Sequence, residues 1–124
     1  MYTYVSLVTL LAVVLNVWFA TKVSLTRGKI KAPAITGSPE FERAQRVHMN
    51  TIEQTVVFLP SLWLAVSVFG DLYTALIGGV WIIGRVLYAR AYWADKNRGF
   101  GFNLTFMPSL VLLIIALYSV ISAI

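Results

Sequence analysis

Four long apolar stretches separated by short polar segments are the feature of this sequence that most restricts its fold. The chain has 124 residues, of which 59% are hydrophobic and 12% are charged. This composition excludes a soluble domain, because too few polar groups are available to cover the surface of a protein this size. A membrane-spanning helix needs about 20 apolar residues, so the chain has room for four spans and almost nothing else.

We therefore predict a single all-α membrane domain over residues 1–124, built as a bundle of four transmembrane helices. The predicted spans cover residues 3–24, 43–69, 72–95 and 103–123. No basic segment precedes the first apolar run, so we expect a retained span rather than a signal peptide. Pro60 and Pro108 lie inside the second and fourth spans and are expected to kink them, whereas Gly99 and Gly101 are expected to separate the third span from the fourth.

Positive charge is distributed unevenly along the chain. All ten lysines and arginines lie in the first or third loop, or in the helical segments leading to them. By the positive-inside rule these two loops face the cytoplasm and both termini face the opposite side of the membrane. The formal net charge of +5 is then explained by membrane topology and a polar site, so no nucleic-acid partner is expected.

Two of the predicted helices carry a polar stripe close to their cytoplasmic ends. At about 100° per residue, the members of each stripe share one helix face: Arg46, Asn50 and Glu53 on the second span, and Arg85, Tyr88 and Tyr92 on the third. An ionised residue at bilayer depth costs about 2.5–3.5 kcal/mol, so the three charged members would together cost roughly 8–10 kcal/mol if they faced lipid. We expect both stripes to face protein, water or a ligand.

The charges around these stripes indicate what such a ligand would be. Arginine and lysine outnumber the acidic residues there, and an excess of guanidinium groups favours an anion. Asn50 and Glu53 add acceptors for an ammonium or amide group. The pattern suits a small zwitterionic ligand with a net negative charge. A purely structural alternative is that Glu53 pairs with Arg46 or Arg85 and joins two helices.

Other residue types narrow the chemistry further. Cysteine is absent and His48 is the only histidine, so we expect no metal site, and any thiol must come from a bound molecule. His48 points away from the stripe on its helix. Asn16 is polar at depth and could bond across helices or touch a ligand. The four tryptophans are expected to pack in the bundle or at the membrane interface.

The two stripes and the residues around them resemble the MAPEG family, the membrane-associated proteins in eicosanoid and glutathione metabolism. The resemblance rests on Phe41, Glu42, Arg43, Arg46, Asn50 and Glu53, followed by Arg85, Tyr88, Tyr92 and Arg98. Members are four-helix subunits that assemble as trimers. The resemblance implies a homotrimer that binds glutathione between subunits at the cytoplasmic side, with a lipophilic second substrate arriving from the bilayer.

The resemblance also implies a role for each matching residue. Arg46, Asn50 and Glu53 would hold the polar ends of glutathione, Tyr88 and Tyr92 would contact its backbone, and Arg85 would belong to the same site. Arg98 matches the arginine that stabilises the glutathione thiolate in catalytic members. Arg27 or Lys29 would reach a glutathione carboxylate.

Departures from the family pattern point to one branch. Gln54 replaces a tyrosine of the leukotriene-forming members, and Asp95 replaces a serine seen in that branch. Tyr88 replaces a histidine of the prostaglandin E synthase-like members, while the presence of Arg98 argues against the non-catalytic branch. The resemblance is nearest to the microsomal glutathione transferases, which implies conjugation of lipophilic electrophiles or reduction of lipid hydroperoxides.

Two other classes of protein fit parts of the pattern. A non-catalytic lipid-binding or scaffold protein would bind lipid without glutathione and without turnover. A small proton-coupled multidrug exporter would use Glu53 to bind protons and cations alternately. Arg46 on the same helix face argues against the exporter, because such a carboxylate should be free of neighbouring positive charge.

Overall fold

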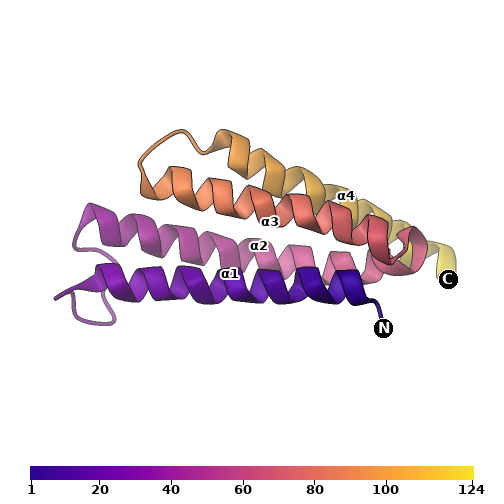
Figure 1. The fold of residues 1–124 in the computed structure, drawn as a ribbon, viewed down its shortest axis with the longest axis horizontal. Coiled ribbons are helices and arrows are strands. Elements are labelled where there is room, and N and C mark those ends of the chain that lie inside the picture. The colour runs from indigo at the N-terminus through magenta and orange to yellow at the C-terminus, as the bar shows by residue number, and fades with distance from the viewer.

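The computed structural model describes all 124 residues and contains four helices. They are α1 (Thr3–Arg27), α2 (Pro39–Phe69), α3 (Asp71–Trp93) and α4 (Gly99–Ala123). Each is long and apolar enough to cross a membrane, which confirms the predicted all-α, four-span architecture. The first and third loops lie at one end of the bundle, and both termini lie with the α2–α3 turn at the other (Figure 1).

Two helices begin earlier than predicted, and a loop side chain contacts the backbone at the start of each. The Phe41 N–H donates to Ser38 Oγ at 3.3 Å and Pro39 occupies the first turn, so α2 begins at Pro39 rather than at residue 43. The Gly99 N–H donates to Asn97 Oδ1 at 2.8 Å, and α4 begins there rather than at residue 103. Helix α3 ends at Trp93 rather than at residue 95, since Asp95 has a φ of 55°.

The expectation that Gly99 and Gly101 separate two helices is wrong, because α4 begins at Gly99 and includes Gly101. Gly101 faces α3 so closely that an added Cβ would overlap the backbone of Tyr88. Across the same interface, a Cβ on Gly84 would come within 2.9 Å of the Leu104 carbonyl oxygen. These two glycines let the α3 and α4 backbones approach each other, as small residues do in membrane helix pairs.

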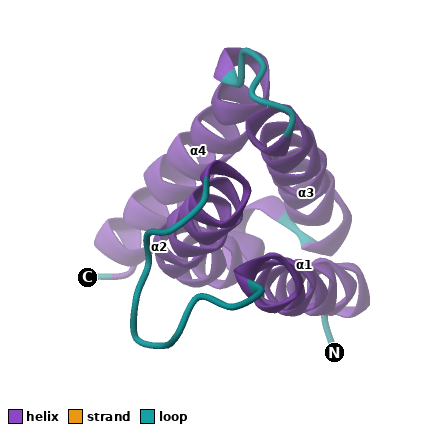
Figure 2. Cartoon of the chain, turned by 90° about the vertical axis from the view of Figure 1, so that its left-hand side faces the viewer, coloured by secondary structure: helices purple, strands orange, loops and turns teal.

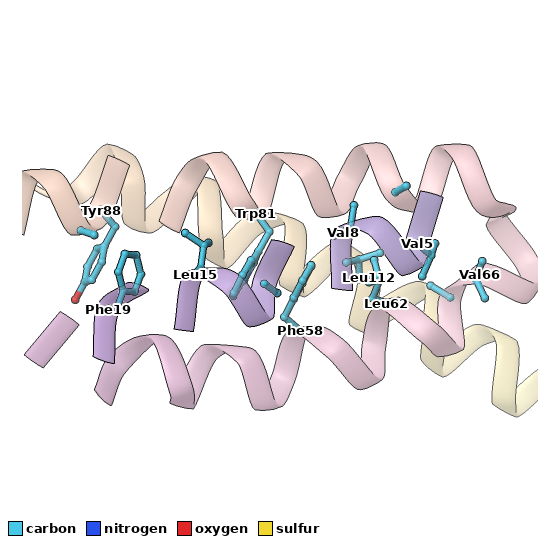
Figure 3. Packing of buried hydrophobic residues seen from close by; sticks show 14 of the residues in the cluster. Val5, Val8, Leu15, Phe19, Phe58, Leu62, Val66, Trp81, Tyr88 and Leu112 are labelled. Carbon is cyan, nitrogen blue, oxygen red and sulfur yellow. The ribbon is translucent and has the colours of Figure 1, made fainter. Parts of the chain in front are cut away.

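Apolar side chains fill the interior of the bundle along its whole length (Figure 3). Helix α1 contributes a row spaced three or four residues apart, from Val5 to Phe19. The rings of Phe58 and Trp81 stack at the centre with centroids 4.0 Å apart and planes 2° apart. Large apolar side chains also cover the outside, for example Ile114 at 58% exposure, so the outer surface matches a hydrocarbon solvent.

Helices α2 and α3 lie between α1 and α4, which do not contact each other (Figure 2). The predicted cross-helix role of Asn16 is confirmed, since its Nδ2 donates to Thr55 Oγ1 on α2 at 3.2 Å. Pro60 and Pro108 lie within α2 and α4, and both helices continue through them.

Asp71 joins α1 to the first turn of α3. Its carboxylate accepts hydrogen bonds from the backbone N–H groups of Tyr4 at 3.1 Å and Val5 at 2.9 Å. The first N–H groups of a helix have no partner within the helix, and a carboxylate is the favoured acceptor for them. No pattern in the sequence predicts this connection, so it is a structural finding.

Replacing Asp71 with alanine is expected to destabilise the protein by about 1–2 kcal/mol, the usual loss for a helix-capping side chain. The measurement is the midpoint of thermal unfolding in detergent, followed by the loss of helical circular dichroism. Asp71→Asn keeps one acceptor oxygen and should lose less. A midpoint for Asp71→Ala equal to that of the wild type would contradict the capping role.

Candidate functional site

Arg85 connects the two polar stripes. It is fully buried at 0% exposure, and its Nη2 donates to Asn50 Oδ1 at 2.9 Å, across from α3 to α2. The guanidinium carbon lies 4.2 Å from the centroid of the Tyr88 ring. A guanidinium over an aromatic face is attracted by the negative face of the ring, so Tyr88 offsets part of the cost of burying the charge.

The contacts continue from Tyr88 to the third loop. The rings of Tyr88 and Tyr92 have centroids 5.6 Å apart, and the guanidinium carbon of Arg98 lies 4.0 Å from the centroid of the Tyr92 ring. Asn50, Arg85, Tyr88, Tyr92 and Arg98 therefore form one continuous series of contacts, which we call the polar row. It runs from the interior of the bundle to the end that carries the first and third loops.

Positive charge concentrates along the polar row. Arg85 lies on the Tyr88 ring and Arg98 on the Tyr92 ring, and Arg46 is one helical turn before Asn50 on the same face of α2. Arg46 is exposed and lines a groove of about 340 Å³ together with Ile35, Glu42, Gln45 and Met49. Three guanidinium groups along the polar row make an environment suited to an anion.

The contact with Arg85 limits what Asn50 can offer to a ligand. Because Oδ1 of Asn50 accepts from Arg85, one of its two acceptor positions is occupied, whereas the Nδ2 amide group is free to donate to a ligand. The expectation that Asn50 supplies an acceptor to a ligand stays a prediction. Arg85 has no exposed surface, and its Nε and Nη1 have no hydrogen-bond partner in the chain. In this structure Arg85 therefore orients Asn50 rather than presenting its own surface to a ligand.

Glu53 lies less than one helical turn beyond Asn50 and is exposed. The structural alternative paired Glu53 with Arg46 or Arg85, but the hydrogen bond of Arg85 goes to Asn50. The exposed carboxylate of Glu53 can accept a hydrogen bond from a cationic group of a ligand, next to the donor of Asn50. The two side chains thus offer one acceptor and one donor on the same face of α2.

Arg27 and Lys29 lie in the first-loop region, apart from the polar row. Arg27 Nη1 donates to the carbonyl oxygen of Ala34 at 3.0 Å, and its guanidinium carbon lies 4.7 Å from the Phe41 ring centroid. These contacts hold the first loop against the start of α2. Lys29 is exposed in that loop. Within one chain, neither residue is brought to the polar row.

An apolar groove lies between α2 and α4, next to the stripe on α2. It has a volume of about 170 Å³ and is lined by Gln54, Val57, Phe106, Ser109, Leu110 and Leu113. Gln54 directly follows Glu53, so polar groups and the apolar groove meet on consecutive residues of α2. Such a junction can accommodate a reaction between a polar molecule and a lipophilic one.

Helical spacing placed the stripe residues on shared faces but gave no sign of the Asn50–Arg85 bond. An arginine on one helix and an asparagine on another predict a hydrogen bond between them only once it is known that α2 packs against α3. His48 is half-buried, and its Nδ1 has no hydrogen-bond partner. No group of three or more His, Cys, Asp or Glu side chains is arranged as a metal site.

Comparison with known proteins identifies related sequences over most of the chain. The pattern of the MAPEG family matches residues 5–118. An uncharacterized protein of Synechocystis sp. is 40% identical over 94% of this chain and 87% of its own length. Microsomal glutathione S-transferase 2 of Homo sapiens is 42% identical over 71% of this chain, and leukotriene C4 synthase of Bos taurus is 38% identical over 68%. These matches span 62% and 58% of the human and bovine proteins, respectively.

Proposed function

Since this chain belongs to the MAPEG family, we propose that it is an integral membrane glutathione transferase that can also reduce lipid hydroperoxides. The observation that carries the proposal is the polar row, in which Arg85 lies on the Tyr88 ring and Arg98 on the Tyr92 ring, with Arg46 one turn before Asn50 on α2. A chain without cysteine can use thiol chemistry only by binding a thiol, and glutathione is an anionic, zwitterionic thiol. The human relative carries this activity in its name.

The residues of α2 suit the two ends of glutathione. In the proposed complex, Arg46 binds a glutathione carboxylate, and the Nδ2 amide group of Asn50 donates to a carboxylate or carbonyl oxygen of glutathione. Glu53 accepts from the amino group of the γ-glutamyl residue. We further propose a homotrimer, in which Arg27 or Lys29 of a neighbouring subunit reaches the second carboxylate, because neither lies at the polar row of its own chain.

Arg98 is the proposed catalytic residue because it ends the polar row with its guanidinium on the Tyr92 ring. An ordinary thiol has a pKa of about 8.5 and is mostly protonated at neutral pH. Lowering the thiol pKa by two units requires about 2.7 kcal/mol, within the effect of one close guanidinium in a partly dehydrated site. The proton leaves to water, and the thiolate that remains is the nucleophile.

The lipophilic substrate is proposed to occupy the groove between α2 and α4, because apolar side chains form most of its lining. In conjugation, a carbon–sulfur bond forms as the leaving group departs. In peroxide reduction, the thiolate attacks the distal oxygen, the O–O bond breaks, and the alkoxide takes a proton. A second glutathione then reduces the sulfenic acid, giving glutathione disulfide and water.

Purified protein in detergent should bind glutathione by titration calorimetry and turn over a generic aryl halide or a fatty-acid hydroperoxide. Assaying both substrates side by side decides which reaction dominates. Lipid binding without glutathione binding or turnover would instead support a non-catalytic lipid-binding protein. Drug-driven proton flux in vesicles would support an exporter that uses Glu53.

Glu53→Gln tests the proposed contact with the glutathione amino group. Charged hydrogen bonds contribute about 1.5–3 kcal/mol, so the variant should bind glutathione about tenfold more weakly or worse. Glutaryl-cysteinylglycine lacks only the amino group and should bind both proteins equally, which calorimetry can check. Equal loss of affinity for both tripeptides would show that Glu53 does not recognise the amino group.

A further inference from the structure

A third groove lies outside the polar row, between α1 and α3 near the end that carries the basic loops. Its volume is about 580 Å³, and Trp18, Arg90, Trp93 and Ala94 line it. At about 100° per residue, Arg90 projects roughly 160° away from Tyr88 around α3, so this groove is on a different face from the polar row. The proposed glutathione reaction makes no use of it.

Aromatic rings form the walls of this groove. The ring centroids of Trp18 and Trp93 are 5.5 Å apart, and Phe19, fully buried behind them, is also 5.5 Å from Trp93. These contacts join α1 to α3 and make the groove a defined surface. The indole Nε1 of Trp93 is buried and has no hydrogen-bond partner. Tryptophan commonly occupies the headgroup level of a bilayer, where one side of the ring is apolar and the other polar.

Two positive side chains stand at the groove, one from each helix. Lys22 Nζ of α1 lies 5.0 Å from the Trp93 ring centroid, and Arg90 of α3 lines the groove directly. Of the five acidic residues in the chain, only Asp95, which follows Ala94, is near these residues in sequence. Two cations at the groove with no acidic residue in its lining make it net positive, so a bound group should be anionic.

Apolar side chains continue from the groove toward the middle of the membrane. Leu87 and Ile83 precede Arg90 on the same face of α3 and are 38% and 57% exposed. Val14 precedes Trp18 on the same face of α1 and is 60% exposed. A ligand with its charge at Lys22 and Arg90 would therefore have hydrocarbon directly below it.

We propose that this groove binds an anionic phospholipid, with the phosphate between Lys22 and Arg90 and the acyl chains along α1 and α3. Basic pockets between membrane helices on the cytoplasmic side are suited to such headgroups. The aromatic walls cover the glycerol region, and the exposed leucine, isoleucine and valine contact the chains. The site selects lipids by headgroup charge and goes beyond the proposed enzymatic function.

Quenching of tryptophan fluorescence by brominated lipids tests this proposal in the full-length protein. Trp81 is fully buried, and a Trp63→Phe background removes the exposed tryptophan outside the groove, so Trp18 and Trp93 account for most of the quenching by lipid. In bilayers of phosphatidylcholine, brominated phosphatidylglycerol should quench more strongly than brominated phosphatidylcholine at the same mole fraction. The affinity for the anionic lipid relative to phosphatidylcholine follows from the ratio of the quenching by the two brominated lipids.

The Lys22→Gln/Arg90→Gln double variant should lose about 25-fold in relative affinity for the anionic lipid, since each such charge contributes about fivefold. Lys22→Arg/Arg90→Lys should retain the preference. Lys31→Gln/Lys96→Gln removes the same charge from the same end of the bundle and should also retain it. Equal quenching by the two lipids, or an equal loss in the Lys31/Lys96 control, would overturn the site. Displacement by millimolar inorganic phosphate would overturn the lipid as its ligand.

Discussion

Arg98→Leu should bind glutathione nearly as well as the wild type but lose the thiolate absorbance and at least about 20-fold in turnover at pH 7. With a thiol pKa of about 6.5, roughly three quarters of bound glutathione is thiolate at pH 7, whereas at a pKa of about 8.5 only about 3% is. The loss should therefore be largest near neutral pH and shrink as the pH rises. Difference absorbance of the bound thiol, titrated against pH, measures it directly.

Lys96→Leu provides a matched control because it removes a cation from the same loop without touching Tyr92. It should leave the titration midpoint of the bound thiol in place. Arg98→Lys keeps a positive charge but not the planar group that lies on the ring, so its midpoint should fall between those of the wild type and Arg98→Leu. An unchanged thiolate titration in Arg98→Leu would remove Arg98 from the mechanism.

The second large effect is expected for Asn50→Asp, which should weaken glutathione binding by about 100-fold while the protein stays folded. Arg85 keeps an acceptor, and gains a charged one, so the buried guanidinium is still paired. Glutathione loses the Nδ2 amide donor of Asn50 and meets a carboxylate oxygen in its place. Charged hydrogen bonds contribute about 1.5–3 kcal/mol, and repulsion between two carboxylates adds to the loss. Calorimetry measures the affinity, and thermal unfolding checks the fold.

Asn103→Asp makes the same chemical change on an exposed position of α4 and should bind glutathione as the wild type does. Comparing the two variants separates a local effect from the general effect of one added negative charge. If Asn50→Asp bound glutathione with wild-type affinity, the side-chain amide of Asn50 would have no part in recognition. Whether the wild-type protein binds glutathione at all is a separate result, and it tests the proposed function itself.

The hydrophobic pattern was enough to predict four helices, because a bilayer admits few other arrangements for an apolar chain. Helix periodicity also placed Arg85, Tyr88 and Tyr92 on one face of α3, and in the structure Arg85 contacts Tyr88 and Tyr88 contacts Tyr92. Both results depend on local regularities, the length of an apolar run and the 3.6-residue turn. Helix starts were less well predicted, since the Ser38 cap on α2 and the contact of Asn97 with Gly99 are single side-chain contacts in polar loops.

Contacts between helices could not be obtained in this way. The bond between Asn50 and Arg85 depends on the rotation of α2 against α3, which the spacing within either helix does not specify. Gly101 was interpreted as a helix break because glycine interrupts helices in water. In the bundle, its missing side chain instead provides the space that Tyr88 occupies on α3. Whether a glycine breaks a helix or allows two helices to pack closely depends on whether a second backbone approaches it.

The carboxylate of Asp71 has a consequence for motion within the bundle. It fastens the beginning of α1 to α3 at the end where both termini lie, opposite the first and third loops (Figure 1). At the other end, the rings of Trp18 and Phe19 pack on Trp93, so α1 is attached to α3 near both of its ends. Tilting α1 alone would break one of these two attachments, and we therefore expect α1 and α3 to move as one unit when the bundle changes shape.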